Sequence, residues 1–285
     1  MEQPTFTKNV FICWFQGEQH LDTLESKKSS IFKENIRKWT CLNPEWSVNV
    51  VSDADLRYAC AQVSRECLDT YDAFDVMHLK IDLGRYALMY VYGGIYVDMD
   101  MYAFRGLDTS DKVQALIHKS SCKHILGLSS LNIDAHEALA FVGRTRMINN
   151  AMMLSTPQNP IVQHLIQHII GNWKANRHAS AFTKVRNVTG PQFFNRFVYS
   201  YLDDPPEDIE LTVFPPYVFE PSPAHGLSDV RNETVAIHQF EMAWVPPAYR
   251  QLLKAYYTLK PFLAIIILII LVFIFRRHKI RKLFI

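Results

Sequence analysis

The sequence of 285 residues is poor in features that define several protein classes. Its five cysteines are odd in number and show neither a CxxC pair nor the spacing of a zinc site, so we predict free, mostly buried thiols instead of a disulfide framework. There is no internal repeat or low-complexity run, and the 10 glycines and 14 prolines are unexceptional. With 49% hydrophobic residues, the composition predicts one globular domain followed by a separate segment.

The main body of the chain also lacks a net positive charge, and its start lacks an apolar stretch. The formal net charge of the whole chain is +2, and the five Lys and Arg residues of 276–285 more than account for it. Residues 1–275 are therefore net acidic, which argues against nucleic acid as a partner. The missing apolar signal stretch favours a domain that faces the cytosol.

A stretch without charge near the C-terminus is typical of a membrane helix. It lies between Lys260 and the basic tail, and we predict a single transmembrane helix there. At about 1.5 Å per residue it spans roughly 22 Å of a ~30 Å hydrocarbon layer, so Lys260 and Arg276 would snorkel or the bilayer would thin. The alternative is a buried soluble helix. The predicted organisation is a domain over 1–250, a juxtamembrane linker over 251–260, the transmembrane helix over 261–275 and a basic tail over 276–285.

The basic tail leaves the topology of this predicted anchor open. Its cations are expected to be attracted to anionic lipid headgroups. The positive-inside tendency keeps such a tail in the cytosol, which would place the domain in a lumen, against the expectation from the N-terminus. The sequence therefore predicts a single-pass membrane protein without deciding the side of the membrane.

The most informative segment is a predicted helix, strand and pair of acids in the first third of the chain. Apolar residues recur at helical spacing from Leu79 to Val91, and Gly93-Gly94 is predicted to end this helix because glycine adopts the left-handed conformation without a Cβ clash. The β-branched and aromatic run that follows predicts a short buried strand. We expect its end to present Asp98 and Asp100 on one face, since residues two apart on a strand share a face.

Two carboxylates on one face in an apolar context predict a bound divalent cation. They repel each other unless positive charge lies between them, and Mg²⁺ or Mn²⁺ with a substrate diphosphate would supply it. On the preceding helix, Asp82 and Arg85 lie three residues apart and share a face, where they could bind a sugar or ribose hydroxyl and a phosphate. The alternatives are a solvated acidic strand end and a local Asp82–Arg85 ion pair.

This pattern resembles a known family, the retaining glycosyltransferases with a DXD motif. The family includes fungal mannosyltransferases, inositol phosphoceramide mannosyltransferases, the α-1,4-galactosyltransferase and the glucosylating clostridial toxins. The pattern Asp-x-x-Arg, Gly-Gly-Ile-Tyr and Asp-x-Asp falls here on Asp82, Arg85, Gly93, Gly94, Ile95, Tyr96, Asp98 and Asp100. The resemblance covers most of the chain and implies an α/β fold of the GT-A type, with a mixed sheet flanked by helices.

The resemblance also implies roles for residues outside the motif. Trp14, after a predicted opening strand, would stack on the nucleotide base, although a core tryptophan is the alternative. Tyr96 and Trp244 would contribute to the donor site, and His238 would approach the metal and the diphosphate. The family often has serine before this last tryptophan, and the chain has Ala243, which removes a hydroxyl that could bond the diphosphate.

Three further segments fall where related enzymes place acceptor-side and sugar-contacting loops. They are Asn149-Asn150-Ala151, the turn from Pro157 to Pro160, and Thr189-Gly190-Pro191. We expect these segments to approach the same site as the acidic motif.

Together these features predict a membrane-anchored, metal-dependent retaining glycosyltransferase. Asp98, Asp100 and Arg85 would be the catalytic residues: the two carboxylates, with His238, would hold Mn²⁺ or Mg²⁺ on the donor diphosphate while Arg85 assists its charge. The donor would be GDP-mannose or a UDP-hexose, transferring mannose, galactose or glucose. The acceptor would be a glycolipid like inositol phosphoceramide, or a glycan. We expect an endomembrane location if the chain is eukaryotic or viral.

Two alternatives remain open at the level of sequence. A phosphatase of the haloacid dehalogenase type also places Asp-x-Asp at a strand end, with the first Asp as nucleophile, but Met101 and Tyr102 do not match its pattern. A catalytically silent sugar- or nucleotide-binding module is the second, with Ala243 as its supporting sign. The intact acidic pair and Arg85 argue against the silent module.

Overall fold

The computed structural model describes residues 5–23, 26–118, 122–221, 229–239, 247–248, 251–252, 255–256, 259 and 262. Apart from Phe262, the predicted membrane segment lies outside the described residues, as do Ala243 and Trp244. No helix within the described part of the chain is both long enough and apolar enough to cross a bilayer.

Helices and strands alternate along most of the chain. The strands are β1 (Asn9–Cys13), β2 (Ser47–Val51), β3 (Gly94–Asp98), β4 (Met101–Ala103), β5 (His124–Ser130), β6 (Ile148–Ser155), β7 (Ile209–Val213) and β8 (Ala236–His238). The α-helices are α1 (Ser26–Leu42), α2 (Asp53–Val63), α3 (Arg65–Ala73), α4 (Met77–Tyr92), α5 (Asp111–Ile117), α6 (Ala135–Val142), α7 (Pro160–Asn176), α8 (Ala181–Lys184), α9 (Pro191–Asp203) and α10 (Pro216–Phe219). Short helices of other types are η1 (Glu18–Thr23), η2 (Leu107–Thr109) and η3 (Val185–Thr189).

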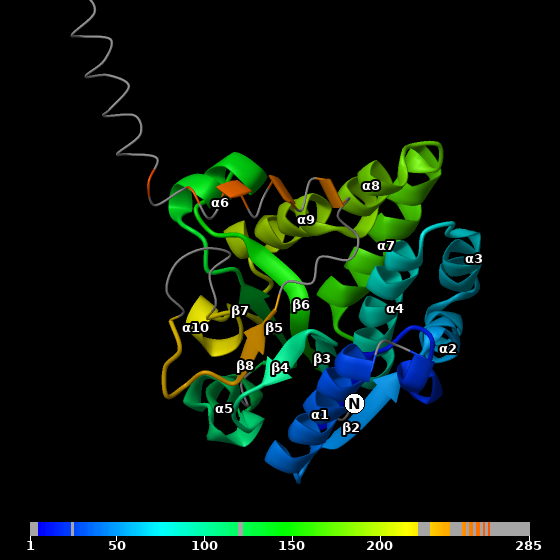
Figure 1. The fold of residues 1–285 in the computed structure, drawn as a ribbon. Helices are drawn as coiled ribbons and strands as arrows, with labels where there is room; N and C mark the ends of the chain where they lie inside the picture. The colour runs from blue at the N-terminus through cyan, green and yellow to red at the C-terminus, as the bar shows by residue number, and fades with distance from the viewer. Residues whose placement is uncertain are drawn as a thin grey trace, which may run out of the picture.

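A mixed six-stranded sheet forms the centre of the molecule, in the order β2-β1-β3-β6-β5-β7 (Figure 1). β1 is parallel to β2 and β3, β6 is antiparallel to β3 and β5, and β5 is parallel to β7. Because β1 and β3 are parallel and Cys13 pairs with Asp98, their carboxyl ends meet at one edge. A separate antiparallel pair, β4 and β8, aligns Met101 with His238.

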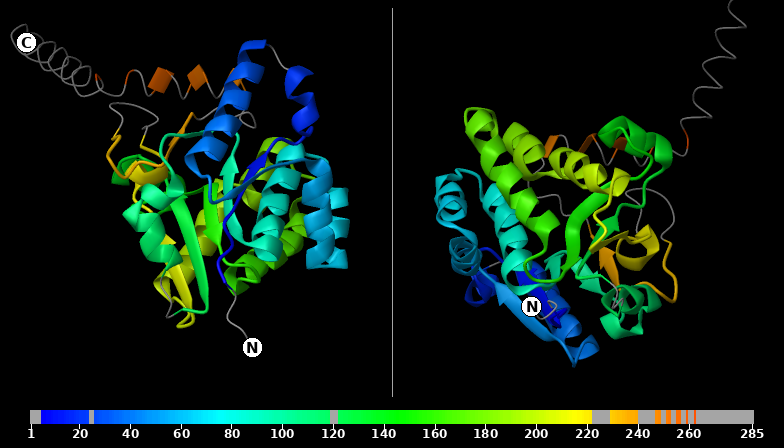
Figure 2. Two further views of the ribbon diagram at one scale, coloured as in Figure 1. Left: turned by 90° about the horizontal axis from the view of Figure 1, so that it is seen from below. Right: turned by 180° about the vertical axis from the view of Figure 1, so that it is seen from behind.

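Helices cover both faces of the sheet (Figure 2), and a hydrophobic core lies on each face. Side chains of α2, α3, α4, α7 and α9 pack on one face, and those of α1, α5 and α10 on the other. Alternate residues of β1 point into different cores: Phe11 and Cys13 into the first, Val10 and Ile12 into the second. This period-two alternation is what a strand buried on both faces requires. The predicted α/β architecture with a mixed sheet between helices is confirmed.

The predicted helix and strand before the acidic motif are confirmed. α4 ends at Gly93, whose φ of +64° lies in the left-handed region. Gly94 has a φ of +99°, and a Cβ there would lie 2.5 Å from the carbonyl oxygen of Asn9. Only glycine therefore lets β3 start this close to β1.

Two local expectations were wrong. Asp98 is the last residue of β3, and Met99-Asp100 forms a turn into β4, so Asp98 and Asp100 do not share a strand face. The predicted loop Asn149-Asn150-Ala151 lies inside β6, in the middle of the sheet.

All five cysteines are free, and Cys13, Cys60 and Cys67 are buried.

Candidate functional site

A cavity of about 470 Å³ lies where the carboxyl ends of β1 and β3 meet. The predicted site residues that line it are Trp14, Asp82, Arg85, Tyr96, Asp98, Asp100 and His238. It is also lined by Asn149, Asn150, Ala151, Gly190 and Pro191 from the predicted acceptor-side segments. Segments remote in sequence thus converge on the acidic motif, whereas the predicted turn from Pro157 to Pro160 supplies none of the lining residues.

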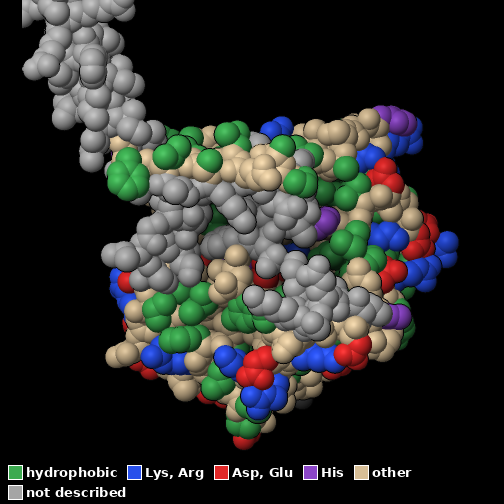
Figure 3. Space-filling model, viewed as in Figure 1, with side chains coloured by type: hydrophobic (Ala, Val, Ile, Leu, Met, Phe, Trp, Pro, Cys, Tyr) green, Lys and Arg blue, Asp and Glu red, His purple; other side chains and the backbone are tan. Residues whose placement is uncertain are grey.

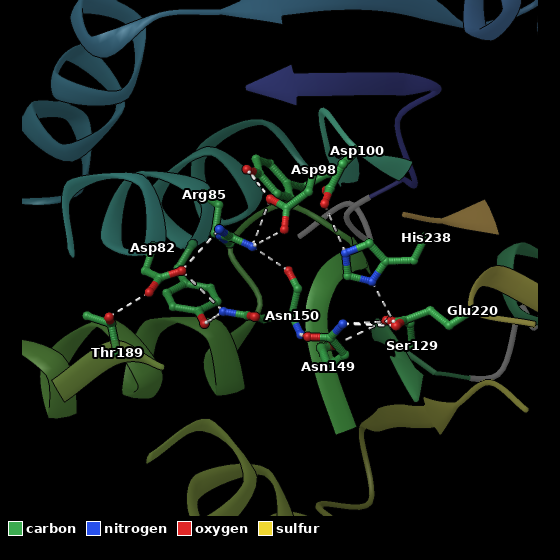
Figure 4. A network of polar contacts seen from close by, with 12 residues as sticks. Asp82, Arg85, Asp98, Asp100, Ser129, Asn149, Asn150, Thr189, Glu220 and His238 are labelled. Carbon is green, nitrogen blue, oxygen red and sulfur yellow. Dashed lines mark hydrogen bonds and ion pairs between the residues drawn. The ribbon is translucent and has the colours of Figure 1, made fainter. Parts of the chain in front are cut away.

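Arg85 contacts both Asp82 and Asp98 (Figure 4). We call these three residues and Tyr96 the motif wall. Arg85 Nη2 lies 3.0 Å from Asp82 Oδ1, and its Nη1 lies 3.2 Å from Asp98 Oδ1. Nη1 also donates to the carbonyl oxygen of Asn150 at 2.7 Å, and the guanidinium lies 4.7 Å from the centre of the Tyr96 ring. Burial opposes this charge, but Asp98 and the other neighbours hold the pKa of Arg85 above its ordinary value. The local ion pair is therefore real and extends to the DXD motif.

Asp82 is the inner acid of this wall and is 6% exposed. Its Oδ2 accepts a hydrogen bond from Thr189 Oγ1 at 2.6 Å, and its Oδ1 accepts one from Asn150 Nδ2 at 3.3 Å. Burial raises the pKa of Asp82 to about 6, although Arg85 acts in the opposite direction. Both carboxylate oxygens are engaged by the protein, so Asp82 is held rigidly beside the cavity.

Asp98 is the outer acid of the motif wall, with 27% of its side chain exposed. Tyr96 donates a hydrogen bond from its hydroxyl to Asp98 Oδ1 at 2.9 Å. Burial raises the pKa of Asp98, Arg85 counteracts this, and Asp100 adds to it. Asp98 lines the cavity, so its partly exposed side chain is available to a ligand there.

His238 stands between two carboxylates on the opposite side of the cavity (Figure 4). Its Nε2 lies 3.4 Å from Asp100 Oδ2, and its Nδ1 lies 3.0 Å from Glu220 Oε2. Burial alone disfavours the imidazolium, yet Glu220 and Asp100 outweigh it and raise the pKa of His238 to about 10. In this arrangement His238 is a cation that donates from both ring nitrogens.

Sequence reasoning missed Glu220, which is fully buried behind His238. It follows α10 and accepts hydrogen bonds from Ser129 and Asn149 as well as from His238. No motif surrounds it in the sequence, where it stands between Phe219 and Pro221. Only the meeting of β5, β6 and β8 with α10 gives it partners.

Trp14 follows β1 and lines the cavity, with its ring 5.5 Å from that of Phe32. Its indole Nε1 is buried and has no hydrogen-bond partner among the described residues. Buried indole N–H groups usually have a partner. From this position Trp14 can stack on a ligand in the cavity. It also packs, partly buried, against the second hydrophobic core.

The cavity supplies some of the ligands that a hard divalent cation needs. Among the described residues no three His, Cys, Asp and Glu side chains are grouped so that they could hold a metal ion by themselves. Asp98 and Asp100 offer carboxylate oxygens at the cavity, the ligand type that Mg²⁺ prefers, and substrate phosphates commonly complete such a shell. His238 Nε2 lies 3.4 Å from Asp100 Oδ2, and as a neutral imidazole it would be the third predicted ligand of the same cation.

Comparisons with known proteins agree with the acidic motif. Residues 29–119 match the family described as the glycosyltransferase sugar-binding region containing a DXD motif. The chain is 23% identical over 218 residues to the initiation-specific alpha-1,6-mannosyltransferase of Candida albicans, covering 71% of this chain and 55% of the relative. It is 24% identical over 147 residues to an uncharacterized glycosyltransferase of Acanthamoeba polyphaga mimivirus, covering 51% of this chain and 49% of the relative. The chain thus spans about half the length of these curated relatives.

Among solved structures, the PaToxG glycosyltransferase is similar over 70% of each chain, with 15% identity and a TM-score of 0.42. Mouse xyloside xylosyltransferase 1 is similar over 75% of this chain and 86% of its own, with 12% identity and a TM-score of 0.38. The family match over residues 29–119 confirms the resemblance predicted from the sequence, and with the two named relatives it supports a glycosyltransferase.

Proposed function

We propose that this chain is a GT-A type glycosyltransferase that transfers a hexose from a nucleotide-sugar to a hydroxyl acceptor. The observation that carries the proposal is that Arg85, Asp98, Asp100, His238 and Trp14 line the same cavity. A nucleoside diphosphate-sugar offers what these residues bind: an aromatic base, a charged diphosphate and polar hydroxyls. The curated mannosyltransferase relative adds support for mannose as the sugar. The candidate donors are GDP-mannose and a UDP-hexose.

The proposed roles divide the donor between the residues of the cavity. Trp14 stacks on the base, while Arg85 and His238 place positive charge beside the diphosphate and stabilise the leaving group. Asp98 and Asp100 hold Mn²⁺ or Mg²⁺, which neutralises diphosphate charge when bound. Asp82 fixes the position of Arg85 and keeps its protein partners, and its carboxylate has acceptor sites left for a sugar or ribose hydroxyl.

We further propose that the configuration of the sugar is retained without a covalent intermediate. A carboxylate nucleophile needs a free oxygen near the anomeric carbon. Both oxygens of Asp82 are occupied by Thr189, Asn150 and Arg85, and Asp98 is bound by Tyr96 and Arg85. The acceptor hydroxyl would then attack from the face that the diphosphate leaves.

Membrane attachment and a lipid-linked acceptor remain part of the proposal. Residues 261–275 carry no charge and precede five cations. Hydrophobic side chains gather along the edge of the molecule that carries α6 (Figure 3). Leu139 and Phe141 of α6 are 55% and 39% exposed, and Leu252 and Phe262 are 63% and 55% exposed. An exposed apolar surface suits a membrane interface, where a glycolipid would be accessible.

The test is a transfer and hydrolysis screen of the full chain in detergent against UDP- and GDP-sugars, with and without Mn²⁺. We expect metal-dependent release of one nucleotide, and its loss in Asp100→Asn. The matched control is Asp203→Asn, because Asp203 is an exposed acid that pairs with Arg144 outside the cavity. Release from neither donor class, together with no thermal stabilisation by any nucleotide, would reject the glycosyltransferase and lead to a phosphate-ester panel.

A further inference from the structure

Glu220 is a buried carboxylate that the proposed chemistry does not yet use. It is 0% exposed, and burying an ionised carboxylate is costly unless hydrogen bonds compensate it. Ser129 Oγ donates to its Oε1 at 2.5 Å, Asn149 Nδ2 donates to Oε1 and Oε2 at 2.9 and 3.0 Å, and His238 Nδ1 lies 3.0 Å from Oε2. Ser129 and Asn149 donate, and His238 Nδ1 donates when it carries a proton, so the three partners match a group that accepts.

These donors come from three strands, of which β5 and β6 are paired with each other at Ser129 and Asn149. Ser129 lies on β5, Asn149 on β6 and His238 on β8, while Glu220 itself caps the C-terminal end of α10. Figure 4 shows Ser129, Asn149 and His238 around the carboxylate of Glu220. Glu220 therefore links the central sheet to the β4–β8 pair that carries His238.

The contacts continue from Glu220 to both cations of the cavity. On one side, Glu220 contacts His238, whose Nε2 lies 3.4 Å from Asp100 Oδ2. Through Asn149, it reaches the backbone N–H of Asn150, which donates to Asn149 Oδ1 at 2.9 Å, and the Asn150 carbonyl oxygen accepts from Arg85 at 2.7 Å. Glu220 is therefore placed to set the orientation of groups on both sides of the DXD motif.

We propose that Glu220 is a positioning residue for sugar transfer, which holds the ring of His238 and the amide of Asn149 in their working orientation. The role in sugar transfer rests on the proposed function. The contacts of Glu220 do not depend on it. An unanchored imidazole can rotate about its side-chain bonds and loses its aim at the diphosphate region beside Asp100. Groups that orient a site residue in this way typically change affinity or activity by about 10–100-fold when mutated.

The first test is spectroscopic and does not require activity. The Glu220→Gln variant keeps the side-chain volume but turns an NH₂ group toward one of three donors. In full-length protein labelled with heavy nitrogen at histidine, we expect a hydrogen-bonded ring N–H signal, assigned to His238 by its absence in His238→Asn. Glu220→Gln should lose or strongly shift this signal, whereas Glu66→Gln, an exposed acid paired with Lys174, should keep it. An unchanged His238 signal in Glu220→Gln would overturn the proposal.

The second test asks whether Glu220 acts through His238. We expect Glu220→Gln to lower kcat by about 10–100-fold with a smaller change in KM for the donor. In a His238→Asn background the same substitution should cost much less, because residues that act as a unit are not additive. Equal costs in both backgrounds would overturn the proposal. If the unmodified protein transfers no sugar, the proposed function fails, and the histidine spectrum still decides the role of Glu220.

Discussion

The two sides of the cavity use the same arrangement of charges but build it in different ways. On the motif wall, Arg85 lies between the buried Asp82 and the outer Asp98. On the far wall, which we define as Ser129, Asn149, Glu220 and His238, the cation His238 lies between the buried Glu220 and the outer Asp100. Each aspartate of the DXD motif is thus paired with its own buried cation and backed by its own inner carboxylate.

The difference lies in how far apart the partners are in the sequence. Asp82 and Arg85 are neighbours on one turn of α4, and Asp98 follows after one glycine stop and one short strand. The far wall draws on residues from position 129 to position 238. The comparison teaches that a local motif supplies one half of the charge pattern, and the sheet topology supplies the other half.

The largest effect is expected when the cation of the motif wall is removed. Arg85→Leu leaves Asp82 buried without its charge partner, and breaking a buried ion pair costs about 3–5 kcal/mol of unfolding free energy. His238→Asn should cost less, because Glu220 keeps Ser129 and Asn149 as donors. Urea unfolding of both variants measures this. Arg57→Leu, which removes an exposed partner of Asp72, is the control with almost no change expected. Equal losses in Arg85→Leu and His238→Asn would contradict the asymmetry.

The next effect concerns turnover and addresses the outer acids. We expect Asp98→Asn and Asp100→Asn each to keep the fold and to lower kcat by about 10²–10³-fold, the scale for removing one preorganised electrostatic group. Steady-state nucleotide release with Mn²⁺ measures this, and thermal unfolding checks the fold. Turnover like that of the unmodified protein in Asp100→Asn would reject the proposed metal site.

A smaller effect is expected for donor binding at the edge of the motif wall. Trp14→Ala removes the proposed stacking platform for the base, which we expect to raise Kd for the nucleotide about tenfold, or about 1.4 kcal/mol. Isothermal titration calorimetry measures it. Trp173→Ala is the matched control, since Trp173 packs on Phe74 and does not line the cavity. If both variants bind equally well, Trp14 is a core residue only.

The smallest effect is a pH dependence of stability that comes from Asp82. Its pKa is raised in the folded state from 3.8 to about 6, so the folded protein binds this proton more tightly than the unfolded chain does. This contribution is complete below the unfolded pKa and is lost as the pH rises toward about 6. Urea midpoints across that window should fall less steeply in Asp82→Asn than in the unmodified protein. Identical slopes would show that Asp82 does not titrate there.

Much of the fold and half of the site could be predicted from the sequence. The helix that ends at Gly93, the buried strand before Asp98 and the proximity of Asp82 to Arg85 depend on neighbours within one or two turns of chain. Glycine conformation and helical spacing act over that range. The prediction that Asp100 lies on the strand was wrong because the alternation of strand faces stops at Asp98. The chain turns after Asp98 and then starts β4.

The sequence by itself determined the α4–β3 unit, the acidic motif and the uncharged C-terminal stretch, since local propensity and composition are enough for these. Only the tertiary structure decided that Glu220 anchors His238, and that Asn150 on β6 joins Arg85 and Asp82. These contacts depend on strand order and register. A buried carboxylate acquires its partners only when separate strands bring their donors to it.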